Sequence, residues 1–100
     1  MKKARFVAAA RREFLAEVSY YNQQQPGLGA RFTAAVEEAT ARALAFPYAG
    51  SEATERTRKV FLKGFPFSIV FRPVEEGIVV FAIAHQARMP VYWQARVQDR

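Results

Sequence analysis

Hydrophobic residues recur with the spacing of a helix in the first half of the chain. From about Ala9 to Gln24 they share one face, while charged residues occupy the others; the apolar members are Phe14, Leu15, Val18 and Tyr21. A second pattern of this kind covers Ala30 to Phe46 and ends at Pro47, because the residue before a proline is disfavoured in the helical conformation. The connection contains proline and glycine and is short, which predicts an antiparallel helix hairpin.

The second half of the chain carries the patterns of β-strands. Thr57 to Lys63 alternates between two faces, with Arg58, Val60 and Leu62 on one and Lys59, Phe61 and Lys63 on the other. Gly64-Phe65-Pro66 supplies a turn, and the next strand has one face lined by Phe67, Ile69 and Phe71. Consecutive strands joined by short turns predict an antiparallel meander.

The residues from Ile78 to Ala84 form a run without charge that is too short to span a membrane. Its branched and aromatic side chains predict a central strand covered on both faces, entered through a turn at Arg72 to Gly77. Ala4 to Ala8 is interpreted as a short first strand, and Pro47 to Arg56 as a surface loop.

These elements predict one α+β domain over residues 1–100, in the order β-α-α-β-β-β. The short N-terminal strand and the helix hairpin pack on a mainly antiparallel sheet, and a basic aromatic segment follows at the C-terminus. One hundred residues with an apolar share of 51% suffice for a single compact core.

The amino-acid composition limits the kinds of site and partner that we expect. No cysteine and a single histidine exclude disulfides and thiolate metal sites, so we expect neither a metal nor another cofactor. The apolar residues after Met1 are interrupted by Arg11-Arg12, so no signal peptide or membrane segment is predicted, and the expected location is cytoplasmic. A net charge of +6 favours a polyanionic or acidic partner, although it also serves solubility alone.

The end of the central strand carries the residues best suited to catalysis. His85 could transfer protons and Arg88 could stabilise charge on a phosphate, a pairing that suits phosphodiester cleavage. Tyr92 could supply a phenol, and Trp93 could stack on a base or a guanidinium. The structural alternatives are a hydrogen-bonded histidine at a strand end and aromatic rings that pack the terminal segment onto the sheet.

Basic residues on neighbouring strands could bind phosphates or a target protein. The candidates for such a concave patch are Arg58, Lys59, Lys63, Arg72, Arg88 and Arg96, joined by Trp93. The alternative is a solvated strand face. No phosphate-binding glycine loop, nucleophile elbow or framed carboxylate pair is present.

Taken in order, these features resemble the RelE/ParE superfamily of toxins from bacterial type II toxin–antitoxin modules, and most closely its ParE, or plasmid-stabilisation, branch. The resemblance covers nearly the whole chain. It is carried by Glu17 with Tyr20-Tyr21, Pro26-Gly27-Leu28-Gly29 with Arg31-Phe32, Pro47, Arg58, Phe65-Pro66-Phe67, and Ala82-Ile83-Ala84-His85 with Arg88, Pro90 and Tyr92-Trp93.

The resemblance implies a toxin that is neutralised by a cognate antitoxin whose extended C-terminal part wraps it. ParE-like members inhibit growth by poisoning DNA gyrase through binding, and this is the function we expect. RelE-like members are ribosome-dependent endoribonucleases that cut messenger RNA. On that alternative His85 or Tyr92 would transfer protons, while Arg58 and Arg88 would hold the scissile phosphate. For capture of the antitoxin we expect Arg58, Arg88 and Arg96 to matter more than Arg11 and Arg12.

Overall fold

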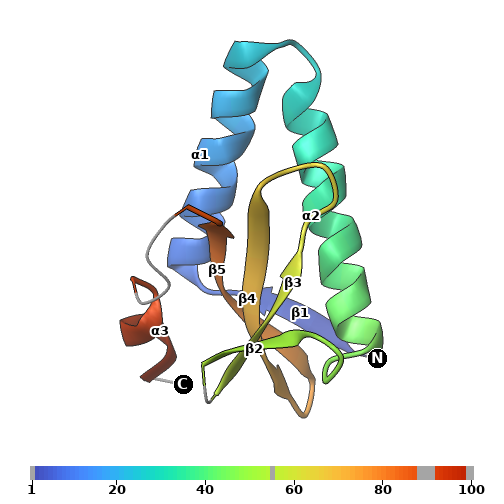
Figure 1. Ribbon diagram of the computed structural model, residues 1–100, viewed down its shortest axis with the longest axis vertical. Coiled ribbons are helices and arrows are strands. Elements are labelled where there is room, and N and C mark those ends of the chain that lie inside the picture. The colour runs from blue at the N-terminus through green and yellow to red at the C-terminus, as the bar shows by residue number, and fades with distance from the viewer. Residues whose placement is uncertain (1, 55, 88–91, 99–100) are drawn as a thin grey trace.

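The computed structural model describes residues 2–54, 56–87 and 92–98 (Figure 1). In order, the elements are β1 (Lys3–Phe6), α1 (Ala8–Gln24), α2 (Leu28–Ala45), β2 (Ser51–Thr54), β3 (Thr57–Phe61), β4 (Phe67–Val74), β5 (Gly77–His85) and α3 (Gln94–Gln98). The strands of this part of the chain form one sheet in the order β1-β5-β4-β3-β2. Only the β1–β5 pair is parallel.

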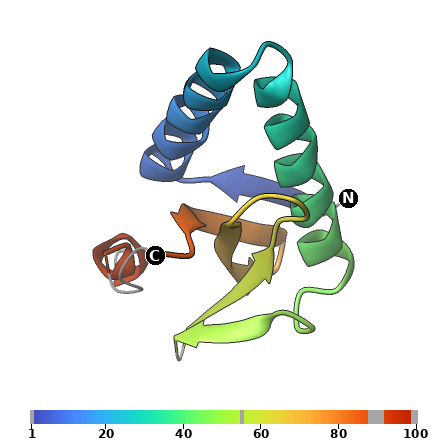
Figure 2. The same cartoon turned by 45° about the horizontal axis from the view of Figure 1, so that its top comes forward.

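The α1–α2 hairpin packs against the sheet, which confirms the predicted α+β fold with its N-terminal strand and its mainly antiparallel meander. Figure 2 shows the two helices meeting at their turn and diverging toward β1. The central strand is also confirmed: residues 78–84 are all buried, and β5 lies between β1 and β4.

Two local predictions were wrong. The stretch from Pro47 to Arg56, expected to be only a loop, contains β2, which pairs with β3 through Ser51 opposite Lys59. Its Ser-Glu-Ala-Thr sequence has no apolar alternation, so the strand arises from pairing with its neighbour rather than from its own pattern. The turn expected from Arg72 is shorter, because β4 continues to Val74 and β5 begins at Gly77.

Two glycines stand where backbone or side-chain atoms approach closely. Gly77 has a φ of 144°, and a Cβ there would overlap the backbone oxygen of Lys3, its parallel partner in β1. At the start of α2, the N–H of Gly29 donates to Oδ1 of Asn22 at 2.9 Å, and a Cβ on Gly29 would lie 2.6 Å from that side chain. Glycine at these positions therefore permits the β1–β5 pairing and the tight hairpin.

Aromatic rings join the helices to the sheet. Phe32 of α2 is fully buried, and its ring centroid lies 5.3 Å from each of Tyr21, Phe65 and Phe67 and 6.2 Å from Phe14. These partners come from α1, the β3–β4 turn and β4. Phe32 thus contacts the other helix and the sheet. Its ring stacks with Phe14 and Tyr21 and meets Phe65 and Phe67 edge-to-face.

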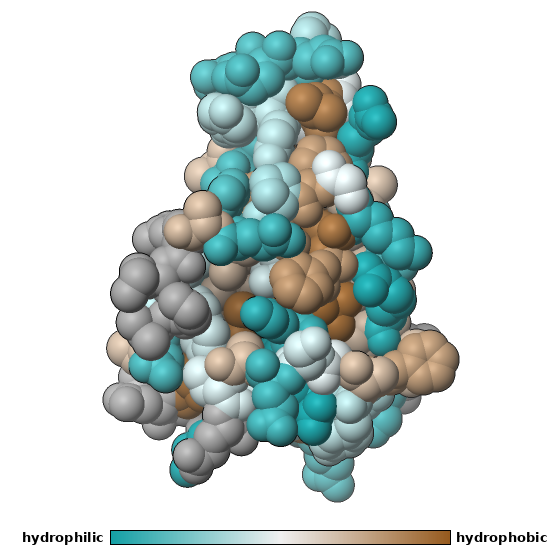
Figure 3. All heavy atoms as spheres, viewed as in Figure 1, coloured by the Kyte–Doolittle hydropathy of each residue, from teal (hydrophilic) through white to brown (hydrophobic). Residues whose placement is uncertain are grey.

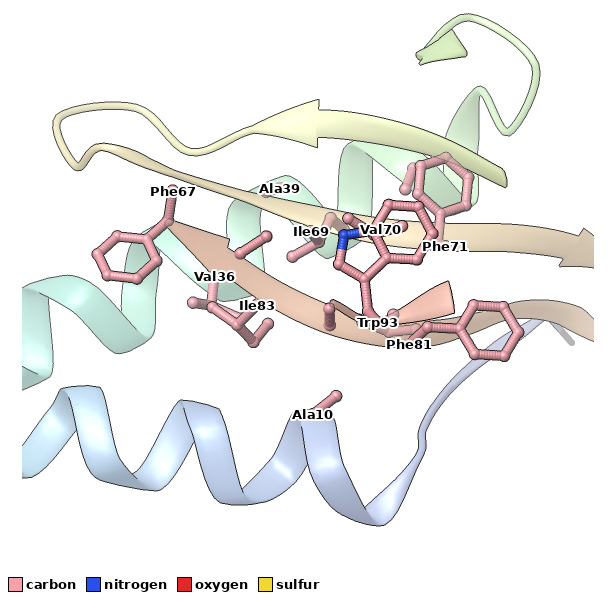
Figure 4. Close-up of a cluster of buried hydrophobic side chains, with 14 of the residues drawn as sticks. Ala10, Val36, Ala39, Phe67, Ile69, Val70, Phe71, Phe81, Ile83 and Trp93 are labelled. Atoms are coloured by element: carbon pink, nitrogen blue, oxygen red, sulfur yellow. The ribbon is translucent and has the colours of Figure 1, made fainter. Parts of the chain in front are cut away.

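The opposite face of the sheet is covered by the C-terminal segment. Strand register places Val70 and Ala84 on the face away from Ile69 and Ile83. Trp93, which is 2% exposed, packs on that face (Figure 4). The small side chain of Ala84 leaves room for the indole, so β5 is buried on both faces, as expected for a central strand.

Truncation of Phe32 tests the aromatic cluster. Phe32→Ala is expected to lower the free energy of unfolding by about 3–5 kcal/mol, because it removes a fully buried ring from a packed site. Urea unfolding of the purified protein measures the change. Leu15→Ala is the matched control, since Leu15 is 58% exposed and its loss should cost less than about 0.5 kcal/mol. An unchanged midpoint for Phe32→Ala would remove this ring from the core.

Candidate functional site

The candidate basic residues of β3 lie on opposite faces of the sheet. Arg58 pairs with Phe71, whose side chain faces the helices, whereas Lys59 pairs with Val70 on the other face. Lys59 and Phe61 border a cavity of about 280 Å³ on that other face; the remaining lining residues are Ala53, Ser68, Val70, Ala84, His85, Gln86 and Trp93. Arg58 and Lys59 therefore do not converge on one phosphate.

Arg58 holds the loop that follows α2. Its Nη1 donates to the backbone oxygens of Tyr48 and Gly50, at 2.9 Å each, and its guanidinium lies 5.4 Å from the centre of the Tyr48 ring. The geometry gives Arg58 a positioning role in this loop.

His85 ends β5 with one ring nitrogen already engaged. The N–H of Ala87 donates to its Nδ1 at 3.0 Å, and its ring meets Phe67 edge-on at 4.9 Å. Both contacts hold the ring in place at the end of the strand. This arrangement is the hydrogen-bonded structural alternative weighed for a histidine at a strand end.

Arg96 is bound to the edge of β5. The pairing of β1 with β5 ends at Val80. Past this point, side chains rather than a strand form hydrogen bonds with the backbone of Phe81 and Ile83. Nη1 of Arg96 donates to the oxygen of Phe81 at 3.0 Å, and Oε1 of Glu13 accepts from the N–H of Ile83 at 3.0 Å. Arg96 and Glu13 also form an ion pair at 3.0 Å, with side chains 23% and 19% exposed. We call this arrangement the Glu13–Arg96 clasp.

The other candidates are dispersed. Nζ of Lys63 lies 3.7 Å from Glu38 on α2, and Arg72 lies 5.6 Å from the centre of the Phe81 ring. Trp93 is buried, and the Tyr92 hydroxyl donates to the oxygen of Ile83 at a long 3.5 Å. Arg88 lies outside the described residues. Arg58 and Arg72 line one cavity of about 300 Å³, whereas Lys59, Lys63 and Arg96 lie at other places. The roles of all these residues in target binding stay predictions.

The helix hairpin bears a groove whose lining the sequence did not identify. It has a volume of about 640 Å³ and is mainly apolar; its lining residues are Phe6, Arg11, Phe14, Leu15, Thr33, Val36, Glu37, Thr40, Ala41 and Leu44. The signal in the sequence was the Phe14-Leu15 pair, which spreads the apolar stripe of α1 over more than one face. The sheet buries only part of that stripe, and Leu15 remains 58% exposed.

A second groove, of about 650 Å³, runs between α2 and the β3–β4 turn. Leu28, Ala35 and Phe65 contribute apolar surface, with Arg31 and Lys63 among the charged residues. Figure 3 shows apolar side chains as a strip down the middle of the face it presents, bordered by hydrophilic ones. Tyr21 also lines this groove; burial above all, and then Glu17 and Tyr20, raises the pKa of its hydroxyl, which therefore stays protonated at neutral pH.

Residues 2–54, 56–87 and 92–98 contain no group of three or more acidic or histidine side chains placed to hold a metal ion. No helix in the same ranges is long and apolar enough to cross a membrane.

The fold and the groove define a class of protein: a small α+β domain whose helix hairpin bears an apolar groove. A family model described as "ParE toxin of type II toxin-antitoxin system, parDE" matches residues 4–90, and the chain belongs to this family. The resemblance found in the sequence is thereby confirmed.

A solved structure described as the chromosomal ParDE toxin–antitoxin system from P. aeruginosa shares the fold, with a TM-score of 0.72 and 20% sequence identity. The match covers 85% of this chain and 96% of that one. A search of the curated proteins finds no match.

A double-mutant cycle tests the clasp. Glu13→Gln and Arg96→Met, made singly and together, are expected to show a coupling free energy of about 1–3 kcal/mol in urea unfolding, because the pair is largely shielded from water. The Glu38–Arg42 pair is the control. It forms a 2.7 Å contact one helical turn apart with side chains 40% and 37% exposed, and its coupling should be clearly smaller. Equal coupling for both pairs would contradict the importance of the clasp.

Proposed function

We propose that this protein inhibits bacterial growth by binding and poisoning DNA gyrase, and that a cognate antitoxin neutralises it. The observation that carries the proposal is the ParE family match over residues 4–90. A mechanism based on binding also agrees with the described residues, since their surfaces are apolar grooves and exposed aromatic side chains.

The ribonuclease alternative lacks comparable support. It requires a proton-transfer residue beside basic side chains that bind the scissile phosphate. His85 has its Nδ1 occupied, and Arg58 uses Nη1 to hold a loop on the face away from Lys59. No observation in the described part of the chain favours this activity over binding.

Gyrase assays test the proposed target. Purified toxin at micromolar concentration is expected to inhibit supercoiling and to trap gyrase on cleaved DNA, and prior addition of the antitoxin should restore activity. His85→Ala should retain the inhibition, because binding needs no proton transfer at this residue. Transcript ends mapped after induction serve as the counter-test: new cleavage sites in messenger RNA, with gyrase unaffected, would favour the ribonuclease.

We further propose that the 640 Å³ groove between α1 and α2 receives an amphipathic helix of the antitoxin. Phe14, Leu15 and Leu44 supply the apolar contacts that such a helix buries, with Arg11 and Glu37 at the same groove. The +6 charge of the chain favours an acidic antitoxin and a fast, salt-sensitive association. Because Arg11 lines the groove, we now expect its reversal to slow capture, in contrast to the expectation from sequence.

A charge placed in the groove tests its occupant. Leu15→Glu is expected to weaken antitoxin binding by roughly 10-fold or more, since it puts a carboxylate into an apolar contact. Calorimetric titration of the purified pair measures the affinity. Tyr20→Glu is the matched control, because Tyr20 lies on the same helix with 52% exposure and does not line the groove. Equal affinity for Leu15→Glu and the wild type would place the antitoxin elsewhere.

A further inference from the structure

Two aromatic side chains project from the loop that follows α2. Phe46 is 67% exposed and Tyr48 is 70% exposed, the highest values among the large hydrophobic side chains that the structure describes. They flank Pro47, two residues apart. Single exposed hydrophobic residues are common, but a pair of aromatic rings on one loop is the composition of a binding surface.

The loop that carries these rings is held by hydrogen bonds. The N–H of Phe46 donates to the oxygen of Arg42 at 2.9 Å, and the N–H of Ala49 donates to the oxygen of Phe46 at 3.0 Å. Arg58 fixes the Tyr48 and Gly50 carbonyls from β3 and lies against the Tyr48 ring. A loop ordered before binding loses less conformational entropy in the complex, so its rings can serve as anchors.

Arginines accompany the rings. Tyr48 borders a cavity of about 300 Å³ with Arg56, Arg58 and Arg72, and Glu52 is the acidic residue among its lining. The local charge is therefore positive. Tyrosine and arginine are the residue types that dominate the energetic centres of protein interfaces, and a positive patch favours an acidic partner surface.

The loop is separate from the groove assigned to the antitoxin but adjoins one end of it. Leu44 lines the groove and precedes Phe46 by two residues, whereas neither Phe46 nor Tyr48 lines it. The groove and the loop are therefore neighbouring surfaces at the C-terminal end of α2. A protein bound in the groove would stand close to the rings and obstruct access to them.

We propose that the Phe46–Tyr48 loop, with Arg56 and Arg72 beside it, is the surface by which the toxin binds an acidic protein surface on its target. The inference rests on the proposed function, since it takes that target to be gyrase. Phe46 and Tyr48 supply apolar anchors, Arg56 and Arg72 supply charge, and Arg58 positions the loop.

The test separates target binding from antitoxin binding. The double variant Phe46→Ser/Tyr48→Ser is compared with the wild type and with Leu15→Glu. Affinity for DNA-free gyrase subunits is expected to fall by roughly 30-fold or more in the double variant, while affinity for the antitoxin stays within about 3-fold. Leu15→Glu should show the reverse. Arg56→Glu should slow association with gyrase at low salt and have little effect at high salt.

The outcomes distinguish the inference from the function beneath it. If the wild type does not inhibit gyrase, the proposed function fails. If the wild type inhibits gyrase and the double variant does so equally, the function stands and the loop is overturned as the docking surface. If the toxin binds gyrase only when DNA is present, the loop's partner is nucleic acid rather than an acidic protein surface, and the inference is overturned. Growth arrest on induction tests the loop without assuming the identity of the target. Equal arrest by the double variant and the wild type also overturns the inference.

Discussion

The packing of Phe32 joins the helix hairpin to the sheet, and the surfaces formed by these two layers depend on this contact. Its ring lies among Phe14, Tyr21, Phe65 and Phe67, so it connects the first helix, the β3–β4 turn and the sheet from a position on α2. The hairpin diverges from its turn toward β1, and the groove on it persists because this cluster fixes the helices from the sheet side (Figure 2). Because a closely packed aromatic cluster has few alternative arrangements, it limits the positions that the two helices can take.

Polar side chains form hydrogen bonds with the backbone groups of β5 that β1 leaves unpaired. β1 pairs only with the first part of β5, and the remaining edge would expose unpaired backbone groups at Phe81 and Ile83. Glu13 and Arg96 satisfy these groups and neutralise each other, which ties the C-terminal segment to the first helix. This part of the β5 edge is therefore closed to an added strand, whereas β2 forms the other edge of the sheet.

The groove and the loop after α2 differ in chemistry. The apolar trough of the helix hairpin suits a helix, whereas the aromatic and arginine-rich loop after α2 suits an acidic surface. Their adjacency at Leu44 and Phe46 offers a physical route to neutralisation, in which one bound protein obstructs the other. In this arrangement Arg58 orders the loop through its hydrogen bonds to the Tyr48 and Gly50 carbonyls.

The sequence by itself determined the helix hairpin, the meander and the buried central strand, because each rests on local periodicity and on proline or glycine at the boundaries. Its ordered motifs also indicated the toxin family. It missed β2, whose Ser51–Thr54 stretch becomes a strand only by pairing with β3. The fate of the basic residues was likewise decided by the tertiary structure: Arg96 meets Glu13 across 83 positions of sequence, and Arg58 meets a loop from another element. Periodicity gives the face of a strand on which a side chain lies, but its partner depends on which distant segments the fold brings beside it.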